Sequence, residues 1–539
     1  MKTEFKSFII IAIIYLLLVF IVPPDGEFPI NDDWAYASNV KYYLDTGNIK
    51  ITNSIIVNIL QIFWGSLFSK FFGFSFTTLR ISTIILSFIG TITMYLILRE
   101  LKFSNKMCIF GALLLLFNPL YFHHTYTFMS EVPFLSLFLL SMLFYIKSIK
   151  KDNTFYLFFG SLFAIFSFLV RQHGIIIPIA TAIYVFFNRR EYKLTKEKIF
   201  ILIIFPILAA FIFQYWYLFI HGQTIKNQYA MKMLFSRNIL LRPFYHSFFN
   251  LLFIGLYLSP FILLIFYIKK FFLNKNSKYL LWIASFMLSL FFLFHFSILK
   301  SLPSHFFHSM INRYGLLGIT HIIDNSPDNP LHIFAITVLS IISATLILLL
   351  VYNEFYIRKR ERSPTIFVYF IGLSYFISLA ILPGVFDRYI LPLIPIILVL
   401  LLSSIERVRE LPFFSAILGI ILVIFAIFSV VGTYDFLNYN RTLWTALNKL
   451  IESGISPEDI DGGSEFNCWF LYDYCLKKFG NIDPIYPGNK NITQRMCVVN
   501  NDYVISLSEL PGYFILDKLK YFSHMGNTYI DIYVLKKVN

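Results

Sequence analysis

Two adjacent carboxylates, Asp32 and Asp33, follow the first apolar run of the chain in the segment Asn-Asp-Asp-Trp-Ala-Tyr-Ala (31–37). If this segment is helical, neighbouring side chains diverge by about 100°, so one acid can face a reaction site while the other faces water. A carboxylate placed in this way can act as a general base. The structural alternative is that these acids cap a helix and complement its dipole.

A third acid, Glu131, stands at the beginning of a later apolar run and follows His123 and His124. An ionisable group at the edge of a membrane span normally faces a cavity, which favours a functional position for Glu131. The structural alternative is a helix start in which Ser130 caps and Glu131 lies in the first turn. Because carboxylate and imidazole groups are common metal ligands, Glu131, His123 and His124 are also candidate ligands for a divalent cation.

Two arginines at the ends of apolar runs could hold a phosphate. Arg388 opens a purely apolar run in Phe-Asp-Arg-Tyr-Ile-Leu-Pro (386–392), and Arg171 occupies a similar corner in Arg-Gln-His-Gly (171–174). The planar guanidinium group can bind a phosphate through two parallel hydrogen bonds. We group Tyr389 with the two arginines as a candidate phosphate ligand. The alternative for Arg388 is that its side chain extends to lipid headgroups.

The composition excludes an ordinary soluble protein. Of the 539 residues, 58% are hydrophobic and only 14% are charged, and the mean hydropathy is +0.70, whereas soluble domains carry about 25% charged residues. The formal net charge is +15, but Lys and Arg lie mainly in short loops between apolar runs. This distribution reports membrane topology and gives no indication of a nucleic-acid partner.

The apolar runs predict about thirteen transmembrane helices in a polytopic, all-α membrane protein. They lie near residues 8–22, 79–98, 107–121, 129–146, 155–170, 175–187, 199–220, 247–268, 279–299, 332–352, 365–382, 389–404 and 411–431. Lys and Arg are concentrated in alternate loops, so the positive-inside rule places the N-terminus in the cytoplasm and the C-terminus outside the cell membrane. The apolar stretch 55–73 would reverse this alternation, and we expect it to form an interfacial helix with an apolar and a polar face.

Two domains follow from this pattern. Residues 1–432 form the predicted transmembrane domain, whose external loop 23–78 carries the first acid pair, and residues 433–539 form a small external α/β domain. The second domain has a predicted helix at 441–453 and predicted strands at 502–507 and 528–536. Its three cysteines allow one disulfide and leave one thiol over, with the pairing undetermined among Cys468, Cys475 and Cys497.

The order and sidedness of these motifs resemble those of the polyprenyl-phosphate-sugar glycosyltransferases of the GT-C superfamily. The nearest branch is that of the protein O-mannosyltransferases and lipid A aminoarabinose transferases, and the resemblance covers roughly residues 1–430. It implies that Asp32 acts on the acceptor, with Asp33 at a companion position where family members typically have Glu. The acid of the second external loop, commonly Asp in the family, is Glu131 here.

The resemblance implies a glycosyltransferase at the external membrane face, and the chemistry of the residues agrees with it. Nucleotide sugars are absent outside the cytoplasm, so the donor would be a sugar linked to a polyprenyl phosphate in the membrane. A phosphate leaving group needs little protonation, so the reaction requires one base and cations on the phosphate. Asp32 would be the base of a single inverting displacement, and Arg388, with Arg171, would hold the phosphate. Glu131 would orient a substrate or bind a divalent ion.

Two other classes of function remain open from the sequence. A lipid or polysaccharide transporter or flippase would use the same acids and arginines along a translocation path, and it would not need Asp32 as a base. A membrane assembly subunit would act through its C-terminal domain, so deleting residues 434–539 would abolish its function while Asp32→Asn would not. The sequence also leaves open the sugar, the prenyl length, the oligomeric state and whether the acceptor is a protein, a lipid or a glycan.

Overall fold

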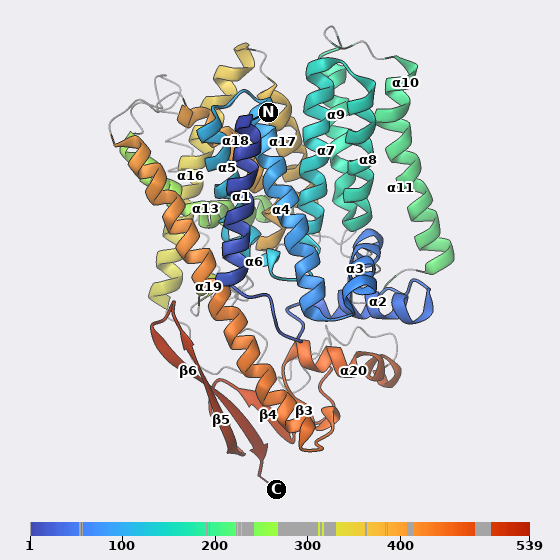
Figure 1. The fold of residues 1–539 in the computed structure, drawn as a ribbon, viewed down its shortest axis with the longest axis vertical. Coiled ribbons are helices and arrows are strands. Elements are labelled where there is room, and N and C mark those ends of the chain that lie inside the picture. The colour runs from blue at the N-terminus through green and yellow to red at the C-terminus, as the bar shows by residue number, and fades with distance from the viewer. Residues whose placement is uncertain are drawn as a thin grey trace.

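The computed structural model describes residues 2–52, 55, 58–189, 192, 195–222, 224, 228, 242–267, 311–312, 315–316, 330–361, 364–382, 384, 386–406, 413–479 and 497–538. Every structural statement below concerns this part of the chain. Long helices form a bundle, and the C-terminal part of the chain extends from one end of it (Figure 1). Apolar side chains from most of these helices meet in one continuous core.

Six helical segments of the described chain are long and apolar enough to cross a membrane. Five of them are the single helices α1 (Lys2–Ile21), α4 (Phe76–Glu100), α7 (Glu131–Lys151), α16 (Pro330–Glu361) and α19 (Phe414–Glu452). The sixth is the continuous segment 196–221, which consists of α10 (Lys196–Ile199), η2 (Phe200–Ile204), α11 (Phe205–Tyr215) and η3 (Trp216–His221). The bent pair α5 (Asn105–Leu116) and α6 (Pro119–Thr125), with an angle of 66° between them, is a seventh candidate. The chain is therefore a multi-pass membrane protein, as the sequence predicts.

Shorter helices complete the bundle. They are α8 (Thr154–Val170), η1 (Gln172–Ile175), α9 (Ile176–Phe187), α13 (Arg242–Tyr257), η5 (Ser259–Tyr267), α17 (Thr365–Ile381), η7 (Asp387–Ile390) and α18 (Leu393–Glu406). Two short strands, β1 (Ile311–Asn312) and β2 (Gly315–Leu316), pair antiparallel. Each predicted span within the described residues overlaps a helix, whereas the predicted span 279–299 lies outside the described residues, so the count of thirteen stays a prediction.

The predicted interfacial stretch contains α3 (Ile59–Phe72), which at 14 residues is too short to cross a bilayer. Its polar side chains Gln61, Ser66 and Ser69 are buried against the protein, whereas Phe71 and Phe72 are about three quarters exposed. Gln61 and Ser69 thus lie on a face apart from the exposed phenylalanines, as the spacing predicts, whereas the polar residue Lys70 is exposed. Because the apolar face points away from the protein, we expect it to contact lipid.

Helix α2 (Asp33–Thr46) carries the predicted acid pair at its start. It ends at Gly47, whose φ of 71° lies in the left-handed region that favours glycine and whose N–H bonds the carbonyl oxygen of Tyr43. The helix packs against α3 and lies across the end of the long helices (Figure 1). The first turns of α2 are buried, so the acid pair lies against the end of the bundle.

Helix α19 leaves the bundle and continues without a break into the C-terminal domain (Figure 1). The predicted boundary at residue 432 therefore falls inside one helix, which joins the predicted span 411–431 to the predicted helix 441–453. No proline interrupts this stretch, so the helical hydrogen bonds can continue through it.

The C-terminal domain contains α20 (Ser464–Phe479), η8 (Pro457–Asp459) and a four-stranded sheet with the order β3-β4-β6-β5. Its strands are β3 (Ile460–Asp461), β4 (Tyr503–Ser506), β5 (Tyr513–Ser523) and β6 (Thr528–Lys537); β3 and β4 are parallel and the other pairs are antiparallel. Strands β4 and β6 coincide with the predicted strands. The sequence did not predict β5, because Asp517, Lys518 and Lys520 interrupt its apolar pattern. A polytopic α-helical fold with a small C-terminal α/β domain is thus confirmed.

Candidate active site

Asp32 occupies the N-cap position of α2, but its side chain makes no capping hydrogen bond. Instead, Oδ2 of Asp32 lies 3.0 Å from Nη2 of Arg388. The Asp32 side chain is 33% exposed and that of Arg388 is 18% exposed, so the pair is accessible from one side. The side-chain capping alternative for Asp32 is therefore not what the structure adopts.

Asp33 has a different environment from its neighbour. It is fully buried, and its Oδ2 accepts a hydrogen bond of 3.0 Å from the backbone N–H of Phe128. Burial raises the pKa of Asp33 to about 8, although the Phe128 N–H opposes this shift. Asp33 is therefore largely protonated at neutral pH, and the geometry favours a structural role for it rather than that of the base.

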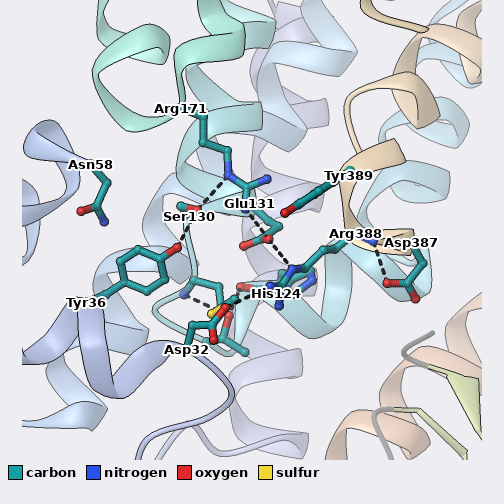
Figure 2. Close-up of polar contacts among 12 residues, drawn as sticks. Asp32, Tyr36, Asn58, His124, Ser130, Glu131, Arg171, Asp387, Arg388 and Tyr389 are labelled. Carbon is teal, nitrogen blue, oxygen red and sulfur yellow. Dashed lines mark hydrogen bonds and ion pairs between the residues drawn. The ribbon is translucent and has the colours of Figure 1, made fainter. Parts of the chain in front are cut away.

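Glu131 is the first residue of α7 and lies between the two predicted arginines (Figure 2). Its Oε1 is 2.5 Å from Nη2 of Arg171 and 3.3 Å from Nε of Arg388. The Glu131 side chain is fully buried. One carboxylate thus holds two guanidinium groups together, while its other oxygen, Oε2, is buried without a hydrogen bond in the described structure.

Ser130 does not cap α7 with its side chain, contrary to the structural alternative. Its Oγ accepts a hydrogen bond of 2.8 Å from Nε of Arg171 and lies 3.4 Å from the hydroxyl of Tyr36. The serine therefore fixes the orientation of the Arg171 guanidinium group. No pattern in the sequence indicates the contact with Tyr36, which comes from α2.

Arg388 and Tyr389 belong to η7, the single turn before α18. Burial lowers the pKa of Arg388, but the carboxylates of Asp32 and Glu131 raise it more, so its pKa lies above the ordinary value and the side chain is charged. The guanidinium group of Arg171 lies 5.6 Å from the centre of the Tyr389 ring. Because Arg388 contacts two carboxylates, its side chain does not extend to the lipid headgroups.

Tyr257 and Asp387 anchor the turn that carries Arg388. Oδ1 of Asp387 accepts a hydrogen bond of 2.7 Å from the backbone N–H of Arg388, and the hydroxyl of Tyr257 donates to Oδ2 of the same carboxylate. Both residues are buried. Sequence reasoning missed Tyr257, because a single tyrosine within an apolar span has no distinguishing pattern.

A pair of arginines also holds the loop 23–28, which connects α1 to the acid segment. Arg80 of α4 is buried and donates to the carbonyl oxygens of Pro24 (3.1 Å), Gly26 (2.8 Å) and Phe28. Arg441 of α19 donates to the carbonyl oxygen of Pro23 at 2.7 Å. Neither arginine was among the predicted site residues, although the charge of Arg80 at the start of the predicted span 79–98 is a usable signal.

His123 and His124 lie on α6 and are fully buried, with their ring centres 5.7 Å apart. His123 packs edge-on against Phe436. None of the four ring nitrogens has a hydrogen bond within the described structure. Among the described residues, no group of three or more His, Cys, Asp or Glu side chains could hold a metal ion. The candidate metal set of Glu131, His123 and His124 therefore does not form such a group.

The structure thus brings Asp32, Glu131, Arg171, Arg388 and Tyr389 together from four separate parts of the chain (Figure 2). Two carboxylates and two guanidinium groups alternate in contact, and the Asp32 carboxylate at one end of this series is partly exposed. The arrangement supplies a carboxylate that can accept a proton and two cations that can bind an anion beside it.

Comparison with protein families gives a match over residues 60–216 to the family described as dolichyl-phosphate-mannose-protein mannosyltransferase. This region includes Glu131 and Arg171 and excludes Asp32 and Arg388. Comparison with the curated proteins gives no match.

Among solved structures, the chain is similar to ArnT from Cupriavidus metallidurans and to the Archaeoglobus fulgidus oligosaccharyltransferase. The apo form of ArnT gives 11% identity over 98% of this chain and 97% of that chain, with a TM-score of 0.48. ArnT bound to undecaprenyl phosphate gives 11% identity over 80% and 72% of the two chains, with a TM-score of 0.42. The oligosaccharyltransferase in the apo form gives 12% identity over 80% and 55%, with a TM-score of 0.39. The family match over residues 60–216 confirms that this chain resembles the polyprenyl-phosphate-sugar glycosyltransferases of the GT-C superfamily, as its motifs predict.

Proposed function

We propose that this protein transfers a sugar from a polyprenyl-phosphate donor to an acceptor hydroxyl at the external membrane face, with inversion at the anomeric carbon. The observation that carries the proposal is the position of Arg388 between Asp32 and Glu131. A permanently charged group thereby lies next to a partly exposed carboxylate. The match to a family of sugar-phosphate-dependent transferases supports the same reaction class.

Asp32 is the proposed base. Its carboxylate takes the proton of the acceptor hydroxyl while the hydroxyl oxygen forms a bond to the anomeric carbon. The bond from this carbon to the phosphate oxygen breaks in the same step, and its electron pair stays on the departing polyprenyl phosphate. A single displacement of this kind inverts the configuration, and a positioned base contributes about 10²–10⁴-fold to such a rate.

Arg388 and Arg171 are the proposed ligands of the donor phosphate. A guanidinium group offers five N–H donors, so Arg388 can keep its contact with Glu131 while it turns other N–H groups to a phosphate. Charge develops on the phosphate as it leaves, and fixed cations stabilise this charge. The ring of Tyr389 lies against Arg171, where it limits the directions that this guanidinium can take.

Glu131 is proposed to orient the cations and to bind a substrate hydroxyl. Its Oε1 contacts both arginines, and its Oε2 is buried without a hydrogen bond in the described residues. His124 lies beside the same cluster in Figure 2, and its ring nitrogens also have no hydrogen bond there. Buried polar atoms normally have partners, and a sugar hydroxyl would supply one to each group.

The proposal is tested with purified protein and its Asp32→Asn variant, each incubated with radiolabelled polyprenyl-phosphate sugars and membrane-extract acceptors in detergent. We expect the wild type to release sugar from one donor and the variant to lose at least about 10²-fold in rate while it still binds that donor. Asp45→Asn, an exposed site on the same helix, is the matched control. Binding of intact donor without turnover, followed by its movement across sealed vesicles, would instead support a transporter.

A further inference from the structure

Helix α20 of the C-terminal domain packs directly against α2. The rings of Trp34 and Tyr472 lie 4.9 Å apart between centres, and both side chains are less than a tenth exposed. Trp34 is the second residue after Asp32 in the sequence. The C-terminal domain therefore reaches the helix turn that carries the proposed base.

Two further contacts extend this interface along α20. Trp469 packs edge-on against Phe76 at the start of α4, with 5.0 Å between ring centres, and Lys50 forms an ion pair of 3.6 Å with Asp473. The ion pair is largely exposed, so its contribution is small. The aromatic contacts belong to one apolar cluster that α2, α3 and α20 share, and apolar burial thus holds α20 in place.

The position of the Asp32 carboxylate depends on how the start of α2 is held. The Asp32 side chain makes no capping bond to α2, and its backbone carbonyl accepts the N–H of Ala35 at 3.0 Å. Any shift of the first turn of α2 therefore carries Asp32 with it, relative to Arg388. A displacement of about 1 Å at a reacting group can cost about 10²-fold in rate.

We propose that Tyr472 is a positioning residue for the transfer reaction. Its ring fixes Trp34, Trp34 fixes the first turn of α2, and this turn sets the distance between Asp32 and the acceptor hydroxyl. The C-terminal domain then completes the active site instead of forming a separate binding module. This inference rests on the proposed role of Asp32 as the base.

The test compares kcat and the donor KM of Tyr472→Ala, Tyr472→Phe and Tyr474→Ala in the full-length protein. Tyr474 lies on the same helix and is 39% exposed, so its substitution is the matched control. We expect Tyr472→Ala to lower kcat about 10–100-fold with little change in KM, and we expect Tyr472→Phe, which keeps the ring, to restore kcat. Thermal unfolding in the same detergent checks that each variant is folded, and Tyr472→Leu replaces the alanine variant if that one is not.

A second arm introduces Tyr472→Ala into the Asp32→Asn protein. If Tyr472 acts through Asp32, the double variant should have the same residual rate as Asp32→Asn alone. An unchanged kcat in Tyr472→Ala would overturn the inference, as would an equal further loss in the Asp32→Asn background. A wild-type protein that transfers no sugar would contradict the proposed function, and the inference would fall with it.

Discussion

Asp32 and Arg388 are 356 positions apart in the sequence, and their side chains form an ion pair of 3.0 Å. Asp32 precedes α2 near the N-terminal end of the chain, whereas Arg388 precedes α18 late in the bundle. The proposed base and the proposed phosphate ligand are therefore brought together by the tertiary fold. This relationship makes the two residues the first targets for substitution.

Arg388→Lys should impair the reaction although it keeps the positive charge. Arg388 uses Nη2 toward Asp32 and Nε toward Glu131, and the single ammonium group of lysine cannot reproduce this fork. We expect kcat/KM for the donor to fall by about 10²-fold, which is typical for the loss of a positioned donor to a developing charge. Steady-state transfer assays measure the effect.

The control for this substitution is Arg99→Lys, in a partly exposed contact of 3.7 Å with Glu4. Surface ion pairs contribute little, so this variant should behave as the wild type. Full activity of Arg388→Lys would show that a positive charge at this position is sufficient. It would contradict the proposal that the guanidinium group of Arg388 is needed to bind the donor phosphate.

Asp33→Asn should keep most of the transfer activity at neutral pH. Burial raises the pKa of Asp33 to about 8, so the wild-type side chain is largely neutral at pH 7 and an amide of similar shape can replace it. The amide oxygen can still accept the hydrogen bond from Phe128. The transfer assay with Asp32→Asn alongside separates the two acids, and a loss in Asp33→Asn as large as that in Asp32→Asn would contradict this assignment.

The same substitution should change how stability depends on pH. Asp33 has an ordinary pKa of 3.8 and a folded pKa of about 8, so between these values the folded chain binds more protons at this site than the unfolded chain. Its contribution to stability therefore decreases as the pH rises from about 4 to about 8 and then levels off. The melting temperature of Asp33→Asn relative to wild type should increase from pH 5 to pH 8. If the melting temperatures of the two proteins depend on pH in the same way, the raised pKa of Asp33 is disproved.

Glu131→Gln should destabilise the protein as well as inactivate it. The substitution removes the charge that lies between Arg171 and Arg388 at a fully buried position. Removing one partner from a buried ion pair costs about 3–5 kcal/mol. We therefore expect a clear fall in melting temperature, measured in the same detergent as the transfer assay.

Glu131→Asp is the informative companion to this variant. It keeps the charge but shortens the side chain by one methylene group, so one carboxylate oxygen can no longer reach both arginines. Stability should be closer to wild type than in Glu131→Gln, while kcat should still fall. A glutamine variant as stable as the wild type would show that the two arginines do not depend on Glu131.

The sequence could predict the acids and arginines of the site because charges at the ends of apolar runs are rare and costly. Glu131, Arg171 and Arg388 have this signal, whereas Asp32 was recognised as one of two adjacent carboxylates after the first apolar run. It could not predict which of two adjacent acids is buried, since Asp32 and Asp33 differ only in their tertiary surroundings. The contact between Tyr257 and Asp387 could not be predicted either, because it joins helices that are distant in the sequence.

Helical periodicity and the length of the apolar runs predicted most of the bundle. The ends of the elements and the tertiary contacts could be predicted less well from the sequence. The polar face of α3 was expected from its spacing, whereas its burial against protein, with the phenylalanines outside, is a property of the surrounding helices. The continuous α19 was divided in the prediction, because the polarity of the sequence changes near residue 432 while the backbone does not. The packing of Tyr472 on Trp34 has no sequence signal at all.

The cysteines of the C-terminal domain give a last prediction. The Sγ atoms of Cys468 and Cys497 are 3.9 Å apart, and both residues are buried. If this domain lies outside the cytoplasm, we expect the two thiols to be oxidised to a disulfide, with two electrons and two protons passing to a thiol oxidant of that compartment. Closing a loop of this length stabilises a domain by about 3–4 kcal/mol.

Maleimide labelling of the denatured protein measures this pairing. Without reductant, only Cys108 and Cys475 should be labelled, and all four cysteines should be labelled after reduction. Cys475→Ser should remove one label and keep the pair, whereas Cys468→Ser should free Cys497. Because cytoplasmic thiols stay reduced, four labels without reductant in protein isolated under thiol-blocking conditions would contradict both the pairing and the external position of the domain.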